Sequence, residues 1–490
     1  MASRKKITEF HGSSRRDFIK YTAALGAWFG LERWRVLEAV GDIGGPALAD
    51  AAACSITNRS VHVFGGSAGF CWFTLLWPQI YAAQNKAKNN KLAFYEPQAG
   101  MFPGTDRPLA YGSVTPWKNL APDHQVSAFM AGDNEFGGTH NDAPNNQLFV
   151  DGNKSSLFSA CATLQLANPT LVPVIVVDVP NGLNKVTLGQ LPYAPAVQGA
   201  PAPVRVQSGL AMANLFDSAA SAAMGPLSTP ANASYFEAYY KAFLGLQATA
   251  NRPTYARGYS VGKAASRIIG INLSSQLKPI NDDYMRYGID KGTPSKLREF
   301  GETLMVTAKA FKLGLTSCVM MPAFNDDYHK AFIDPGEPMK TIKVISTILD
   351  GFLGDLRVPD PSCAGTRISD NLVMTFHSDT PKNPIDATPD WIDATPGKCN
   401  WIYALGAGWL RTGWYGGVTI ENGASVVTTF DPANGKDIRN APGAASNTTT
   451  AAAIPTAGAI AYAVAKGDMR RVGDVYKGGD FSGIVIPKIQ

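Results

Sequence analysis

The stretch VHVFGGSAGFCWF, residues 61–73, joins a strand pattern to a helix pattern through a glycine-rich turn. A short apolar run ends at Gly65 and Gly66, and the segment FCWFTLLWPQIYAAQNKAK continues with helical spacing. Strand, tight turn and helix in this order form the repeating unit of α/β sheets. The same stretch therefore predicts an α/β fold that begins near residue 60.

The pentapeptide GGSAG within this stretch has two interpretations. It fits the pattern of a nucleophile elbow, in which Ser67 would attack an ester. In α/β-hydrolases, however, the elbow follows several earlier strands, whereas here it lies close to the start of the chain. The other interpretation is that the glycines permit a tight turn and close helix packing, with Ser67 at the N-terminus of the helix. This second interpretation is favoured, and the first stays open.

The N-terminus is typical of an export signal. Residues 14–20 read SRRDFIK, a twin-arginine pattern, and an apolar stretch follows at residues 21–31. Small residues at Ala47–Ala49 suit a cleavage site. We therefore expect residues 1–49 to be a twin-arginine leader and the remaining chain to be periplasmic or secreted.

Charge, hydropathy and cysteine spacing exclude several classes of protein. Removing the eight Lys/Arg and five Asp/Glu of residues 1–49 from the chain totals of 44 and 39 leaves a net charge of +2, which is too small to attract nucleic acid. No run of about 20 apolar residues is present, so we expect no membrane span. The six cysteines lack the close pairs of a zinc knuckle, and in an exported protein some of them could form disulfides.

Residues 50–490 are expected to form a single α/β domain. Apolar runs predict strands at residues 171–179, 317–322, 371–376 and 401–406, the last of these being the final core strand, and helical periods predict helices at residues 233–247, 295–313 and 339–356. Strands alternating with helices predict a mostly parallel central sheet with helices on both faces.

Two segments differ in composition from the rest of this domain. Residues 191–233 and 441–457 are rich in Ala, Pro and Gly, and we expect insertions that form surface loops. The C-terminal segment GDMRRVGDVYKGG is polar and lacks a strong period, so we expect a peripheral element.

Three pairs of acid and imidazole side chains lie in loops that we expect to follow strands. The pairs are His140 with Asp142, Asp327 with His329, and His377 with Asp379. Two such residues in i, i+2 positions on an extended loop can face one divalent metal ion, and ligands in parallel sheets bind beyond the carboxyl ends of the strands. The alternative for each pair is a turn-capping Asp beside a surface His.

Five motifs together resemble the twin-arginine-exported family called domain of unknown function 1501, of the alkaline phosphatase and sulfatase-like superfamily. They are SVHVFGGSAGF, THNDA at residues 139–143, FNDDYH at residues 324–329, NLVMTFHSDTP and ALGAGWLRTGWYGG at residues 404–417. The resemblance covers most of the mature chain. It implies an alkaline phosphatase-like fold and a metal-assisted phosphate or sulfate ester hydrolase.

The resemblance also implies roles for particular residues. His140, Asp142, Asp327 and His329 would bind a divalent metal such as zinc, calcium or manganese, Thr139 would occupy the nucleophile position, and His377 and Asp379 would assist. The chain departs from the family pattern at two places: Ser67 and Ala68 stand where the turn normally has an Asp, and the segment TPGKCNW at residues 395–401 lacks the usual Asp-His dipeptide. These losses leave a working metal site and a degenerate site without metal equally open.

The sequence thus carries three hypotheses for function. The first is a metal-assisted hydrolase of a small-molecule ester outside the cytoplasm. The second is a non-catalytic protein of the same fold that binds a cell-envelope or secreted ligand and holds no metal. The third, which is less favoured, is a serine esterase that uses Ser67.

Overall fold

A computed structural model describes fourteen stretches of the chain. They are residues 56–64, 126–131, 148–153, 155–168, 170–177, 196–201, 203–216, 273–324, 336–360, 363, 365–377, 400–421, 424–439 and 446–487. The export signal, Ser67, and the predicted helix at residues 233–247 lie outside these stretches. Among the described helices none is long and apolar enough to cross a bilayer.

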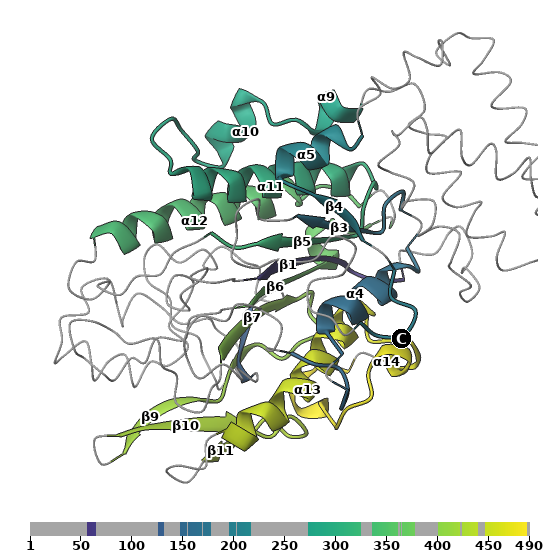
Figure 1. Cartoon of the computed structure of the whole chain (residues 1–490), viewed down its shortest axis with the longest axis vertical. Helices are drawn as coiled ribbons and strands as arrows, with labels where there is room; N and C mark the ends of the chain where they lie inside the picture. The colour runs from purple at the N-terminus through teal and green to yellow at the C-terminus, as the bar shows by residue number, and fades with distance from the viewer. Residues whose placement is uncertain are drawn as a thin grey trace, which may run out of the picture.

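The centre of the molecule is an eight-stranded sheet with the order β4-β3-β5-β1-β6-β7-β2-β8 (Figure 1). Its strands are β1 (Arg59–Phe64), β2 (Val126–Ala131), β3 (Val174–Val177), β4 (Val204–Val206), β5 (Cys318–Pro322), β6 (Leu372–His377), β7 (Asn400–Gly406) and β8 (Gly413–Tyr415). Among these eight strands β7 alone runs against its neighbours, because it pairs antiparallel with both β6 and β2. The expectation of a mostly parallel sheet in an α/β fold is confirmed.

Helices pack on both faces of this sheet, as predicted (Figure 1). The helices of one face are α5 (Gly209–Asn214), α9 (Leu273–Leu277), α10 (Asn281–Arg286), α11 (Ser295–Lys312) and α12 (Gly336–Asp355). The helices of the other face are α4 (Leu157–Gln165), α13 (Ser446–Val464) and α14 (Met469–Val475).

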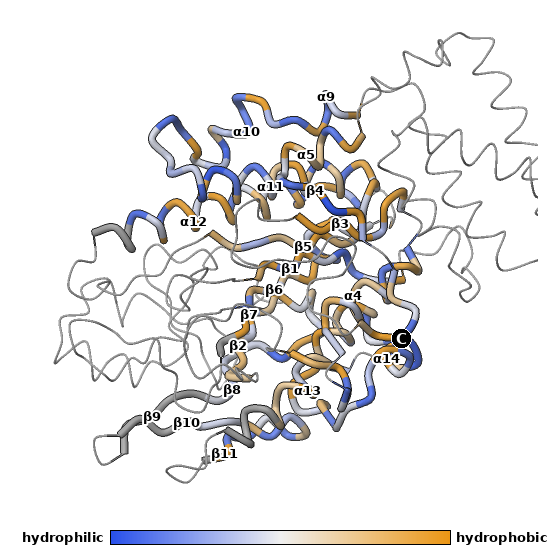
Figure 2. Tube along the Cα trace, viewed as in Figure 1, coloured by the Kyte–Doolittle hydropathy of each residue, from blue (hydrophilic) through white to orange (hydrophobic). Residues whose placement is uncertain are grey.

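The alternation of side chains along each strand supplies both cores. In β1, Val61 and Val63 face the layer that contains α11 and α12, whereas His62 and Phe64 face α4. Successive side chains of a strand point to opposite faces, so a strand buried on both sides reads as a nearly continuous apolar run. Figure 2 shows this as a band of hydrophobic colour along the central strands.

The C-terminal part differs from the prediction in three ways. Residues 446–457, expected to be a surface loop, form the first part of α13, where Ala452, Ala453 and Ala457 are buried. Ala favours helix and its small side chain lets the helix lie close to the sheet. Because α13 is apolar on nearly all sides, it shows no amphipathic period, and its Thr and Pro455 resemble loop signals. Here the loop prediction was wrong.

The second difference is that residues 401–406 are not the last strand. Strand β8 joins the main sheet beside β2, and a separate antiparallel sheet follows, made of β9 (Gly417–Glu421), β10 (Ala424–Phe430) and β11 (Asp437–Arg439). The third is that α14, expected to be peripheral, contributes Val472 and Val475 to the core. Within residues 191–233, the described part likewise contains β4 and α5 rather than loop alone.

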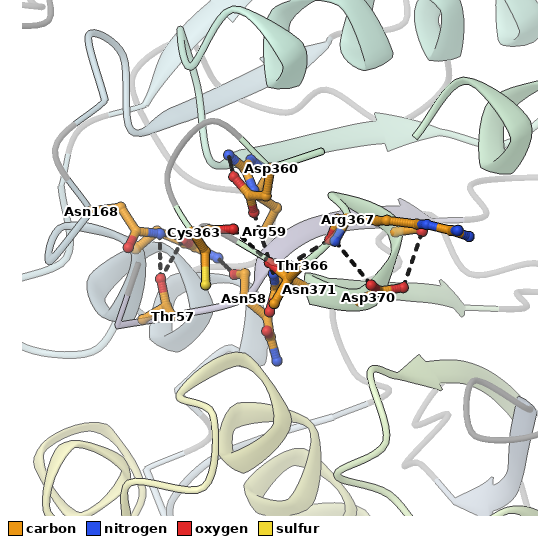
Figure 3. A network of polar contacts seen from close by, with 12 residues as sticks. Thr57, Asn58, Arg59, Asn168, Asp360, Cys363, Thr366, Arg367, Asp370 and Asn371 are labelled. Carbon is orange, nitrogen blue, oxygen red and sulfur yellow. Dashed lines mark hydrogen bonds and ion pairs between the residues drawn. The ribbon is translucent and has the colours of Figure 1, made fainter. Parts of the chain in front are cut away.

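A buried polar network fixes the amino end of β1 (Figure 3). The Arg59 guanidinium donates two hydrogen bonds to the Asp360 carboxylate, with N···O distances of 2.5 and 2.9 Å, and both side chains are almost fully buried. Asn371 Nδ2, at the start of β6, donates to Thr366 Oγ1 at 3.0 Å and to Asp360 at 3.3 Å. The bidentate pair therefore ties β1 and β6 to the segment that follows α12.

We expect Asp360→Asn to lower the free energy of unfolding by about 3–5 kcal/mol, because it leaves the Arg59 charge buried without its carboxylate. Urea denaturation of the purified protein measures the change. The matched control is Asp474→Asn, since Asp474 is exposed on α14, and its effect should stay within about 0.5 kcal/mol. Equal effects of the two substitutions would contradict the assigned importance of the pair.

Candidate functional site

Three neighbouring strands end at one level of the sheet. Strand β1 pairs in parallel with β5 and β6, and its last residue, Phe64, lies opposite both Pro322 and His377. The segments that leave the sheet at this edge begin with GGSAG after β1, FNDDYH after β5 and SDTP after β6. The carboxyl edge of a parallel sheet is where ligands bind in α/β proteins, so this edge is the candidate site.

Strand β2 directs a fourth segment to the same edge. It is antiparallel to β7, which is antiparallel to β6, so β2 and β6 run in the same direction. Its last residue, Ala131, lies opposite Asn400, and Thr139, His140 and Asp142 follow it in the sequence. With adjacent strands about 4.8 Å apart, the ends of β5 and β2 lie about 19 Å apart. Segments of several residues can span that distance.

His377 is the one predicted site residue that lies within the described stretches. Thr139, His140, Asp142, Asp327, His329 and Asp379 lie outside them, so their predicted roles stay predictions. His377 is the last residue of β6 and only 1% exposed. The alternative of a surface histidine beside a turn-capping Asp is therefore wrong for this residue.

The His377 ring is held by two contacts. Its Nε2 lies 2.8 Å from Thr375 Oγ1, on the same face of β6. On its other side the ring packs against Phe158 of α4, with ring centroids 4.8 Å apart. Helix α4 is positioned by its N-cap, Ser156, whose hydroxyl accepts a hydrogen bond from the Phe158 amide at 3.0 Å. The first turn of α4 thus covers the histidine.

A second buried histidine completes this arrangement. His62 of β1 lies opposite Thr375 in the parallel ladder, and its Nδ1 is 2.8 Å from Thr375 Oγ1. Its ring meets Phe158 edge to face, with centroids 5.5 Å apart. One threonine hydroxyl therefore bridges two imidazoles. We call these three residues the His62–Thr375–His377 array.

Sequence reasoning missed His62 and Thr375. The signal for His62 was a single polar residue inside SVHVF, an otherwise apolar strand that is buried on both faces. Such a residue must find a partner inside the protein. The partner is on β6, and no feature of the sequence gives the register between these strands.

Two buried nitrogen atoms of the array, His62 Nε2 and His377 Nδ1, have no hydrogen-bond partner within the described stretches. A hydroxyl donates one proton and accepts others. If both rings donate to Thr375, the two unpartnered nitrogens carry lone pairs; if Thr375 donates to one ring, the unpartnered nitrogen of that ring carries a proton. Buried polar atoms without partners are rare in folded proteins and call for an explanation such as a ligand or an ion.

Both histidines are neutral at physiological pH. Burial lowers the pKa of His62 to about 3. Burial, and secondarily the proximity of His62, holds the pKa of His377 well below its ordinary value. A neutral imidazole with one nitrogen hydrogen-bonded and the other available is the form that contacts metals or metal-bound ligands. The His377 environment therefore fits a site of this kind.

Burial also determines the protonation state of two cysteines on the α4 face of the sheet. Cys318 of β5 and Cys161 of α4 are free thiols and fully buried. Burial raises the pKa of Cys318 to about 12 and raises that of Cys161 well above its ordinary value. Both stay protonated, and thiols react as thiolates. A cysteine mechanism on these two residues is therefore excluded.

The described stretches contain no group of three or more His, Cys, Asp or Glu side chains placed to hold a metal. Any metal held at the carboxyl edge would need ligands from segments beyond these stretches. No protein-family model, curated protein or solved structure matches the chain. The features of the described stretches that bear on function are therefore the topology of this edge and the His62–Thr375–His377 array.

The stability of the protein should fall as the pH decreases below about 6.5. For His62, between that value and about 3, the unfolded state binds a proton that the folded state does not. The pKa of His377 is also lowered by burial, so each histidine contributes a slope of up to about 1.4 kcal/mol per pH unit in the same direction. Urea denaturation between about pH 4.5 and pH 8 measures this slope. We expect His62→Gln to reduce this slope by up to about 1.4 kcal/mol per pH unit, the contribution of one proton. An unchanged slope would contradict burial of the neutral His62 ring.

We expect Thr375→Val to destabilise the protein by about 1–3 kcal/mol for each ring nitrogen that loses its partner. The control is Thr307→Val in α11, where the lost bond, from Thr307 Oγ1 to the Thr303 carbonyl at 2.7 Å, supplements a helical hydrogen bond. Its cost should be the smaller, about 1 kcal/mol. Equal costs in urea denaturation would show that the bridge is unimportant.

Proposed function

We propose that this protein is an exported hydrolase of phosphate or sulfate esters that uses a divalent metal at the carboxyl edge of its sheet. The observation that carries the proposal is the parallel register of β5, β1 and β6. In this register Phe64, Pro322 and His377 lie side by side, so the segments that follow these three residues leave the sheet at the same edge. The direction of β2 adds the segment with Thr139, His140 and Asp142. The candidate ligands thus belong to segments that leave the sheet at the same edge.

The resemblance to the domain of unknown function 1501 family supports the finer part of the proposal. An alkaline phosphatase-like fold is compatible with an eight-stranded mixed sheet that has helices on both faces. In this proposal His140, Asp142, Asp327 and His329 hold zinc, manganese or calcium, a set of nitrogen and oxygen donors that suits such ions. The metal would polarise the ester and stabilise the negative charge that develops during hydrolysis.

The remaining residues have separate roles in the proposal. The Thr139 hydroxyl lies in the segment after β2 and would attack the phosphorus or sulfur atom. His377, oriented by its 2.8 Å contact with Thr375, would hydrogen-bond through Nδ1 to the bound group, with Asp379 nearby in the sequence. The low pKa of His377 keeps the ring neutral, so it adds no positive charge that would repel a cation.

Metal content and ester hydrolysis of the exported protein test this proposal. We expect nearly one equivalent or more of zinc, manganese or calcium by mass spectrometry, and hydrolysis of p-nitrophenyl phosphate or sulfate that a chelator abolishes and the metal restores. Asp327→Ala and His140→Ala should reduce both metal content and rate by 10-fold or more, on the order expected for a ligand. His124→Ala is the control, because His124 precedes β2 by two residues in the sequence, whereas His140 follows it.

Two results would favour the competing hypotheses. A stable protein that retains no metal and hydrolyses neither ester would indicate a non-catalytic binding protein. Covalent labelling by a fluorophosphonate that is lost in Ser67→Ala would indicate a serine esterase. That result would contradict the interpretation of GGSAG as only a tight turn.

A further inference from the structure

Cys363 forms a disulfide, and its partner is a cysteine outside the described stretches. Of the six cysteines, Cys161 and Cys318 are free and buried, which leaves Cys54, Cys71 and Cys399. We propose that the partner is Cys54, so that a cross-link joins the beginning of the mature chain to the segment between α12 and β6. The three candidates differ in the edge of the sheet that each can reach.

Cys363 lies at the amino edge of the sheet (Figure 3). Its amide donates to the Asp360 carbonyl at 3.1 Å, and its carbonyl accepts from Thr366 Oγ1 at 3.0 Å. Asp360 in turn binds Arg59, the first residue of β1. Cys363 is therefore held near the point where β1 and β6 begin.

The sequence position of Cys399 points to the opposite edge. It immediately precedes Asn400, the first residue of β7, and β7 is antiparallel to β6 with Ile402 opposite His377. Strand β6 alone spans about 16 Å at about 3.3 Å per residue, and Asn400, to which Cys399 is covalently joined, lies beyond the carboxyl end of β6. The Cα atoms of a disulfide are at most about 7 Å apart, so this pairing is excluded.

Cys71 follows the carboxyl end of β1 by seven residues. To reach Cys363 the chain would have to turn back after Phe64 and follow the whole of β1, about 16 Å at about 3.3 Å per residue. Both faces of that strand are already covered, because His62 and Phe64 pack against Phe158 of α4 while Val61 and Val63 belong to the core with α11 and α12. A direct return path is therefore closed.

Cys54 precedes Arg59 by five residues, a reach of at most about 17 Å. The chain between them enters at the amino edge, where the Ile56 carbonyl accepts a hydrogen bond from Arg471 at 3.0 Å and Thr57 bonds Gln165 and Asn168. Cys363 lies at the same edge, because its amide donates to the carbonyl of Asp360 and the Asp360 carboxylate binds Arg59. Cys54 is thus the one candidate whose sequence position places it at the correct edge.

The chemistry is an exchange with an acceptor disulfide, as supplied by a thiol–disulfide oxidase or by oxidised glutathione. One S–S bond forms between Cys54 and Cys363 and the acceptor S–S bond breaks, so two electrons and two protons pass from the two thiols to the acceptor, which leaves as a dithiol or two thiols. Such bonds persist in oxidising compartments. The cross-link also requires that leader removal leaves Cys54 in the mature chain.

Peptide mapping of the exported protein tests the assignment. Free thiols are alkylated under denaturing, non-reducing conditions, and the protein is digested with trypsin. We expect residues 358–367 to be covalently linked to the peptide that ends at Arg59, and the linked species to disappear on reduction. A link from residues 358–367 to residues 399–411 or to residues 60–86, or alkylated Cys363 in folded protein, would overturn the proposal.

Variants provide a second measurement that does not depend on detecting one peptide. Cys54→Ala and Cys363→Ala should lower Tm by the same amount, and the double variant should lower it no further, because each removes the same bond. Reductant should shift the wild type to the Tm of the variants. Cys399→Ala is the control and should retain the linked peptide; loss of the link in that variant, or additive effects of the first two, would contradict the pairing.

Discussion

The parallel register of β1 with β5 and β6 is the constraint on which the remaining structure depends. It sets Phe64, Pro322 and His377 side by side, and it also sets His62 opposite Thr375. Because side chains alternate between faces, a shift of one residue would exchange the valines of β1 with its polar residues. The apolar core against α11 and α12 and the polar bridge against α4 therefore specify the same register.

Polar groups are buried at both ends of β1, and they are satisfied differently. At the amino end the Arg59 charge is matched by a carboxylate through two hydrogen bonds, and the surrounding amides and hydroxyls connect to them. At the carboxyl end two neutral imidazoles share one hydroxyl, and one nitrogen of each ring has no hydrogen-bond partner among the described residues. The amino end is thus organised around a paired charge, whereas the carboxyl end is organised around uncharged rings.

Much of the architecture could be predicted from the sequence because it depends on local pattern. The runs SVHVF, SCVMMP and NLVMTF are short, apolar and bounded by turn residues, and each forms a parallel strand. α13 could not be predicted in the same way, since a helix buried on most of its surface has no polar face to reveal its period. At the site, His377 was found from its position after a strand, but His62 and Thr375 depend on pairing between strands more than 300 residues apart in the sequence.

The reversed direction of β7 determines how the segment between β6 and β7 is attached. β6 ends and β7 begins at the carboxyl edge on neighbouring strands, so both attachment points of the connection formed by residues 378–399 lie at one edge of the sheet. A connection anchored in this manner can change in length or composition while the folded scaffold stays as it is. Insertions or substitutions between these two strands would therefore alter the candidate site without changing the register of the sheet.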